Sequence, residues 1–185
     1  MRIIAGRWRG RTLRAPPGTG TRPTADRVRQ ALFDMLMHAP WCGQAAIEQS
    51  VVLDVFAGTG ALGLEALSRG AARATFIEHD ARALACLRVN IAACRAGDVS
   101  VVLAADALAP PRGQPASLVF LDPPYGQNLV ERGVAALTEA GWISPEALLV
   151  AEFGRDEPAP AVARRLLAER AHGAARIAVW RHGVG

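Results

Sequence analysis

The sequence predicts an α/β domain with a mostly parallel sheet. From residue 51 onward, short β-branched runs alternate with Ala- and Leu-rich stretches, which is the pattern of repeated strand and helix units. A glycine-rich turn follows the first of these runs and opens the next helix. The 185 residues, with 51% hydrophobic content, are sufficient for one compact domain with a sizeable core.

The expected elements follow from hydrophobic periodicity and turn residues. A short hairpin is expected over residues 1–14, because apolar pairs flank a turn-prone stretch at 6–10. A helix should begin at Thr24, since apolar residues recur at helical spacing from 28 to 36. The region from Arg164 to Arg181 predicts an antiparallel pair that turns at His172-Gly173. The remaining strands are expected at 51–56, 74–78, 99–103, 117–121 and 147–152, and the helices at 61–69, 81–96 and 129–140.

Positive charge is concentrated at the N-terminal end. Residues 1–38 hold eight arginines and two acidic residues, a net charge of +6, whereas residues 39–185 carry −2. A basic arm on a near-neutral body is typical of a protein with a polyanionic partner, because neutralised phosphates release counterions. We therefore divide the chain into a basic hairpin-and-helix extension at 1–38 and a main domain at 39–185. The candidate phosphate contacts are Arg7, Arg9, Arg11, Arg22, Arg27 and Arg29.

The glycine-rich turn is a candidate nucleotide-binding loop. Glycines permit a tight turn and a close approach of ligand to backbone, and the helix N-terminus offers unpaired N–H groups. With Glu78 twenty residues after Gly58, the same glycines also fit the dinucleotide-binding fingerprint. The spacing alone therefore does not choose the cofactor. The residues of the turn expected around the ligand are Phe56, Ala57, Gly58 and Gly60.

Three acidic residues at strand ends favour one cofactor. Asp54 would repel a pyrophosphate on the loop, but it would attract the amino group and sulfonium of S-adenosylmethionine by about 1 to 4 kcal/mol at about 4 Å. Glu78 is suited to the two ribose hydroxyls, and Asp106 to the adenine amino group. Asp80 is expected to cap the helix that follows it. Together, Asp54, Glu78 and Asp106 predict S-adenosylmethionine as the cofactor.

The candidate catalytic residues are Asp122, Pro123, Pro124 and Tyr125, which follow the fourth predicted strand. They reach the same edge of the sheet as the glycine-rich turn, where ligands gather. The prolines remove two N–H donors and leave an array of acceptors. Asp122 and the Pro123 carbonyl can take both N–H bonds of an exocyclic amino group while Tyr125 stacks on the base. The nitrogen lone pair is then free to meet an electrophilic methyl group, and Asp122 can accept the released proton.

These motifs resemble the amino-methyltransferases of the Rossmann-like class, in which an acid-x-Phe-Ala-Gly-[Ser/Thr]-Gly loop precedes an [Asp/Asn]-Pro-Pro-[Tyr/Phe] loop. The stretches RIIAGRWRGR at 2–11 and RPTADRVR at 22–29 narrow the resemblance to the bacterial 16S ribosomal RNA guanine-N2 methyltransferase family. The family implies a seven-stranded domain with an N-terminal hairpin. It also implies that Gly58 and Gly60 line the cofactor, that Glu78 holds its ribose, and that 122–125 hold the base.

The resemblance gives the basic arm a partner, namely 16S ribosomal RNA or a small-subunit assembly particle. Arg7, Arg9 and Arg11 would alternate along one strand of the hairpin and face phosphates together. Trp8 is expected to pack on the domain. The target guanine must leave its stack to reach Asp122, which restricts the substrate to loops or opened helices.

The composition excludes several classes of protein. The three cysteines show no metal-binding spacing, so no metal is expected. No apolar run reaches the roughly 18 residues of a membrane span, and the N-terminus lacks the apolar core of a signal peptide. We therefore expect a cytoplasmic monomer that does not bind membranes.

Four other functions compete with this interpretation. A DNA or RNA adenine-N6 methyltransferase would use the same tetrapeptide chemistry, and a glutamine-amide methyltransferase would use a closely related one. A nicotinamide dehydrogenase is disfavoured by Asp54 and leaves 122–125 without a role. A non-catalytic RNA-binding module would retain the basic arm and lose the cofactor site.

Overall fold

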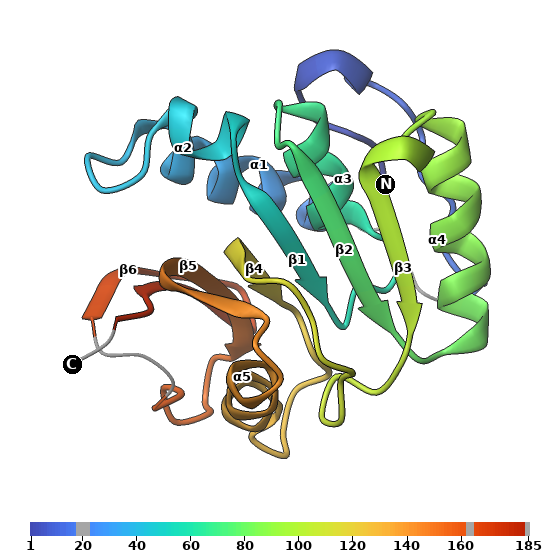
Figure 1. The fold of residues 1–185 in the computed structure, drawn as a ribbon. Coiled ribbons are helices and arrows are strands. Elements are labelled where there is room, and N and C mark those ends of the chain that lie inside the picture. Colours follow the sequence, from blue (N-terminus) through green and yellow to red (C-terminus); the bar gives the residue numbers. More distant parts are fainter. Residues whose placement is uncertain (18–22, 162–164, 184–185) are drawn as a thin grey trace.

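The computed structural model describes residues 1–17, 23–161 and 165–183, and its centre is a seven-stranded sheet (Figure 1). The strand order is β3-β2-β1-β4-β5-β7-β6. Strands β1 to β5 run parallel, and β7 is antiparallel to both of its neighbours. The predicted Rossmann-like, mostly parallel sheet is therefore confirmed. The strands are β1 (Val51–Val55), β2 (Arg73–Glu78), β3 (Ser100–Ala104), β4 (Ala116–Leu121), β5 (Ile143–Gly154), β6 (Arg165–His172) and β7 (Ala175–Arg181).

Helices cover both faces of the sheet, which gives three layers (Figure 1). Apolar side chains of α1, α3, α4 and the N-terminal segment share one core with one face of the sheet, and those of α5 share a second core with the other. Because the central strands are buried on both faces, their sequences are almost continuously apolar. None of the helices in the described ranges has the length and apolar character that a membrane crossing needs. The helices are η1 (Gly6–Trp8), α1 (Pro23–His38), α2 (Gln44–Glu48), α3 (Ala61–Ser68), α4 (Ala81–Ala93), η2 (Gly97–Val99) and α5 (Leu129–Glu139).

The main differences from the predicted boundaries have local causes. Strand β5 begins four residues early, because Ile143 pairs with Ala116 before a register shift separates that pair from the regular part of the ladder. Helix α4 ends three residues early, and Arg95 just beyond it has a φ of 52°, a left-handed conformation that stops a helix. The short helix α2 was not predicted.

The predicted N-terminal β-hairpin is wrong in its detail. The segment does fold back on itself, with an isolated bridge between Arg2 and Thr12 and a bond from the Ile3 N–H to the Arg11 carbonyl at 2.9 Å. It forms no regular strands, and the 3-10 helix η1 occupies its turn. The reason is that the N–H groups of Ile4 and Ala5 donate to a side chain of α3 and are not available for a strand ladder.

That side chain is Glu65, which is completely buried. Its carboxylate accepts hydrogen bonds from Ile4 N at 2.7 Å and Ala5 N at 3.0 Å. It also forms an ion pair with Arg69 at 2.8 Å and lies 3.7 Å from the guanidinium of Arg29 on α1. A buried charge is tolerated only when it is paired and hydrogen-bonded. Glu65 therefore joins the N-terminal segment, α1 and α3 at one point.

We predict that Glu65→Gln lowers the free energy of unfolding by about 3–5 kcal/mol, because the buried guanidinium of Arg69 loses its nearest carboxylate and that of Arg29 keeps only Asp26. Urea denaturation followed by circular dichroism measures the change. The matched control is Asp34→Asn, which removes a half-exposed carboxylate 4.0 Å from Arg69 and should cost at most about 1 kcal/mol. Equal losses in the two variants would show that Glu65 does not hold this region together.

Candidate active site

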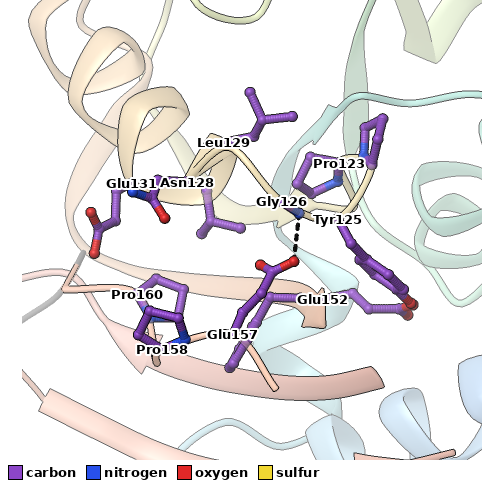
Figure 2. Close-up of a pocket in the computed structure, with 13 residues that line it drawn as sticks. Pro123, Tyr125, Gly126, Asn128, Leu129, Glu131, Glu152, Glu157, Pro158 and Pro160 are labelled. Carbon is purple, nitrogen blue, oxygen red and sulfur yellow. Dashed lines mark hydrogen bonds between the residues drawn. The ribbon is translucent and has the colours of Figure 1, made fainter. Parts of the chain in front are cut away.

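Two cavities lie at the edge of the sheet where β1, β2, β4 and β5 end. The larger has a volume of about 570 Å³ and is open to solvent, and the smaller has about 250 Å³ (Figure 2). Pro123, Pro124 and Tyr125 line both, so the predicted catalytic tetrapeptide lies between them. The other residues lining the larger cavity are Phe56, Glu78, His79, Asp80 and Asp122.

The glycine-rich turn has the strained backbone expected of a close-approach loop. Phe56, Gly58 and Gly60 have φ values of 57°, 54° and 77°. At Gly60 a Cβ atom would lie 2.4 Å from a methyl carbon of Leu87, so a side chain there would force Leu87 to move. Ala57 is buried, and its N–H donates to the Ile77 carbonyl at 3.1 Å, which ties the turn to β2.

Asp54 lies beneath this turn and braces it. It is 1% exposed, and its Oδ2 accepts a hydrogen bond from Gly63 N at 2.8 Å, in the first turn of α3. Burial raises the pKa of Asp54 to about 8, against the opposing effect of the Gly63 bond. The contact that the structure gives Asp54 is thus with the loop, and its direct attraction for a cationic ligand remains a prediction.

The carboxylate of Glu78 is held at the wall of the larger cavity by backbone N–H groups. Its Oε2 accepts from Gly58 N at 2.8 Å, and its Oε1 accepts from His79 N at 2.7 Å and Asp80 N at 2.8 Å. These bonds fix the carboxylate beside the glycine-rich turn and leave about one lone-pair site, on Oε2, for a ligand. Asp80 caps α4 by accepting from Arg82 N and Ala83 N, which confirms its predicted role.

Asp106 is less closely associated with the site. It is exposed, and its Oδ1 accepts from Leu108 N at 2.9 Å within its own turn. A bond from Ala105 N to the Glu78 carbonyl at 3.1 Å brings that turn next to β2, but Asp106 does not line the larger cavity. Its contact with an adenine amino group remains a prediction.

Asp122 and Tyr125 form an acidic cluster with Glu152, a residue that the motif analysis missed. The Tyr125 hydroxyl donates to Glu152 Oε1 at 2.6 Å, and Tyr125 is 49% exposed. Burial and the Glu152 charge raise the pKa of Asp122 to about 7. The Asp122 residue is nevertheless accessible from the open side of the cavity, and solvent there weakens the effect of burial. Burial and the bond to Glu152 also raise the pKa of Tyr125, which therefore stays a hydrogen-bond donor.

A signal for Glu152 was present in the sequence. It is an acidic residue at the end of a predicted apolar strand, as are Asp54, Glu78 and Asp122. An acidic residue at the end of the fifth predicted strand therefore marks Glu152 in the same way as the acidic residues that mark the ends of the first four.

The predicted phosphate contacts behave differently from one another. Arg27 is exposed, whereas Arg29 is 5% exposed and paired with Asp26 at 2.9 Å, so the prediction that Arg29 contacts RNA is wrong. Arg29 is buried because it supplies counter-charge to Glu65. Arg22 lies outside the described residues.

The arginines of the arm do not alternate along a strand, contrary to the prediction. Arg7 belongs to η1 and stacks on Trp8 at 4.3 Å, while Arg11 donates to the Ala93 carbonyl at the end of α4. Trp8 is half-buried against the domain core, as predicted. The backbone N–H of Trp8 donates to the Ser68 hydroxyl at the end of α3, so the tip of the arm lies at the edge where β1 and β2 begin, opposite the edge that holds the tetrapeptide (Figure 1).

The sheet order, the glycine-rich turn and the acid-Pro-Pro-Tyr loop together define a methyltransferase of the Rossmann-like class. Within that class, the chain belongs to the family described as Conserved hypothetical protein 95, whose model matches residues 1–181.

Relatives and solved structures agree with this family. The chain is 44% identical over 163 residues to Ribosomal RNA small subunit methyltransferase D of Escherichia coli, covering 88% of this chain and 79% of the relative. The protein of the same name in Haemophilus influenzae is 43% identical, with 85% and 81% covered. The solved structure of the Escherichia coli protein yhhF superposes with a TM-score of 0.86 at 36% identity, covering 100% of this chain and 99% of the other.

Asp54 makes folding stability depend on pH. Its pKa is about 8 in the folded protein and ordinarily 3.8, so folding takes up a proton between these values and stability falls as pH rises from about 4 to about 8. We predict that Asp54→Asn removes this loss of stability. The free energy of unfolding of the variant should exceed that of the wild type by about 2–5 kcal/mol at pH 9 and should differ little from it near pH 4.

Urea denaturation across this pH range makes the comparison. The exposed Asp98 supplies the matched control, because Asp98→Asn should leave the pH dependence of the wild type unchanged. Parallel stability curves for the wild type and Asp54→Asn would contradict the assignment.

Proposed function

We propose that this protein transfers a methyl group from S-adenosylmethionine to the exocyclic N2 amino group of a guanine in 16S ribosomal RNA. The observation that carries the proposal is the position of the tetrapeptide. Asp122, Pro123, Pro124 and Tyr125 share one cavity of about 570 Å³ with Glu78, beside the glycine-rich turn. The site for the methyl donor and the residues that would accept hydrogen bonds from the target amino group therefore lie side by side. The names of the relatives support the RNA substrate.

The residues around the larger cavity fit the cofactor. Its volume lies in the range of small-molecule sites, and the oriented Glu78 carboxylate keeps an acceptor site on Oε2 for a ribose hydroxyl group. Glu78, Phe56, Gly58 and Gly60 would hold the cofactor, with Asp54 and Asp106 near its two ends. When bound, S-adenosylmethionine supplies an electrophilic methyl group on a sulfonium.

The tetrapeptide orients the amino group of the base. The lone pair of an exocyclic nitrogen is delocalised into the ring and must be turned toward the methyl group. Asp122 and the Pro123 carbonyl accept the two N–H bonds, and the Tyr125 ring stacks on the base. The raised pKa of Asp122, about 7, suits a group that takes the proton as the nitrogen loses it.

The direct test is transfer of labelled methyl from S-adenosylmethionine to 16S RNA or small-subunit particles from cells that lack this gene. Nucleoside analysis should find the label in N2-methylguanosine. We predict that Asp122→Ala lowers kcat/KM by about 10²-fold or more while the affinity for the cofactor, measured by calorimetry, is retained. The exposed Asp98→Ala is the control and should keep full activity.

Three other outcomes would contradict parts of the proposal. Label in N6-methyladenosine would keep the mechanism and overturn the base. Loss of cofactor affinity in Asp122→Ala would overturn the division of roles between Asp122 and Glu78. Absence of both transfer and cofactor binding in the wild type would favour an RNA-binding module.

The exposed arginines of the arm are proposed to bind phosphates. We predict that Arg9→Ala weakens RNA binding severalfold and lowers the slope of log affinity against log salt concentration by about 1, because one phosphate contact is lost. Filter binding at several salt concentrations measures both. Arg165→Ala, at an exposed position on the outermost strand β6, is the control and should leave affinity and slope unchanged.

A further inference from the structure

We propose that Glu152 is the residue that selects guanine, by accepting a hydrogen bond from the ring N1–H of the target base. The inference rests on the proposed function and goes beyond it, because the tetrapeptide alone does not choose between bases. It is carried by the position of Glu152 beside Asp122 and by its contact with Tyr125.

The strand register places Glu152 next to the catalytic carboxylate. Leu121 of β4 pairs with Ala151 of β5 in the parallel ladder, so the next residues, Asp122 just after β4 and Glu152 near the end of β5, lie on neighbouring strands at the same level. Glu152 then accepts the Tyr125 hydroxyl at 2.6 Å. The tetrapeptide is thus contacted by a second carboxylate from the adjacent strand.

Glu152 also lines the smaller cavity together with Tyr125 (Figure 2). The volume of this cavity, about 250 Å³, is sufficient for a purine base, and Pro124, Leu129 and Phe153 contribute apolar walls. A base inserted here has Pro123, Pro124 and Tyr125 on one side, with Asp122 next to them in the larger cavity, and Glu152 within reach of its polar edge.

The acceptors of the tetrapeptide serve guanine and adenine equally. Both bases carry an exocyclic amino group with two N–H bonds, which Asp122 and the Pro123 carbonyl can accept. The bases differ at the adjoining ring nitrogen N1, which carries a hydrogen in guanine and a lone pair in adenine. An ionised carboxylate only accepts hydrogen bonds. Glu152 therefore attracts guanine N1–H and repels adenine N1.

The charges of the cluster favour the same base. Burial and the neighbouring charge of Glu152 raise the pKa of Asp122, and the two carboxylates repel each other. The guanine edge presents N1–H and N2–H side by side, and these donors would reduce that repulsion. Glu152 is half-buried, so a base that lacks N1–H and displaces water from its carboxylate leaves an acceptor without a donor, at a cost in binding.

The other two glutamates that line the smaller cavity already accept hydrogen bonds from backbone N–H groups. Glu157 accepts the N–H of Gly126, and Glu131 accepts the N–H of Ala161 at 2.6 Å. Figure 2 shows Glu131 on the α5 side of the cavity, away from Tyr125. Glu152 is the one of the three whose bond goes to the tetrapeptide.

The experiment replaces the target guanine with 2-aminopurine, which keeps the 2-amino group and lacks N1–H. Once the labelled nucleotide has been mapped, 16S RNA carrying either base at that position is made by splinted ligation and offered to the enzyme. The wild type should prefer guanine by about ten- to a hundredfold in kcat/KM. In Glu152→Gln the preference should fall to within about threefold, because the amide can donate to the bare N1.

Glu131→Gln is the matched control, since it removes the same charge from the same cavity and should keep the wild-type preference. Circular dichroism and cofactor affinity confirm that each variant is folded. An unchanged preference in Glu152→Gln, with guanine still methylated by the wild type, would overturn this inference alone. Failure of the wild type to methylate guanine would instead overturn the proposed function.

Discussion

The buried carboxylate of Glu65 determines where the N-terminal segment lies, and the position of the basic arm depends on it. Its neighbours on the arm, Ile4 and Ala5, are some 60 residues away in the chain. A second buried polar residue, Asn90 of α4, holds the end of the same segment by bonds to both backbone groups of Arg14 and also reaches the Thr59 carbonyl in the glycine-rich turn. The arm is thereby fixed to the two helices that frame the cofactor loop and is not a free tail.

Sequence reasoning succeeded where local chemistry decides and failed where a distant partner decides. The central strands are buried on both faces, so apolar runs alone located β1, β2 and β4 to within a residue. The form of the arm was not predictable in this way, because Glu65 takes N–H groups that a hairpin needs. The prediction that Arg29 contacts RNA failed for the same reason. Its charge suggested RNA, whereas its partners are Asp26 on its own helix and the buried Glu65 on another.

The acidic residues at strand ends show how one sequence signal leads to several roles. Asp54 is buried beneath the turn and accepts a hydrogen bond from the Gly63 N–H, so it stabilises the start of α3 after the turn. Glu78 is held by three N–H groups at the wall of a cavity. Asp122, just after β4, and Glu152, near the end of β5, lie on adjacent strands, and the Tyr125 hydroxyl donates to Glu152. The strand ends gave the location of the site, but the donors around each carboxylate, which depend on the folded loops, give the role.

Because basic and acidic side chains lie at opposite edges of the sheet, we expect affinity for RNA and selection of the base to depend on different residues. The exposed Arg7 and Arg9 flank Trp8, whose backbone is bonded to the end of α3 at the edge where the strands begin, while carboxylates line the cavities beside the tetrapeptide at the opposite edge (Figure 1). Phosphates are repelled from an acidic cavity, but the donor edge of a guanine is not. On the proposed function, an RNA held by the arm must therefore extend along the molecule and present one base, removed from its stack, to the catalytic edge. Phosphate contacts at one end then contribute affinity for any RNA of suitable shape, and the carboxylates at the other decide which base reacts.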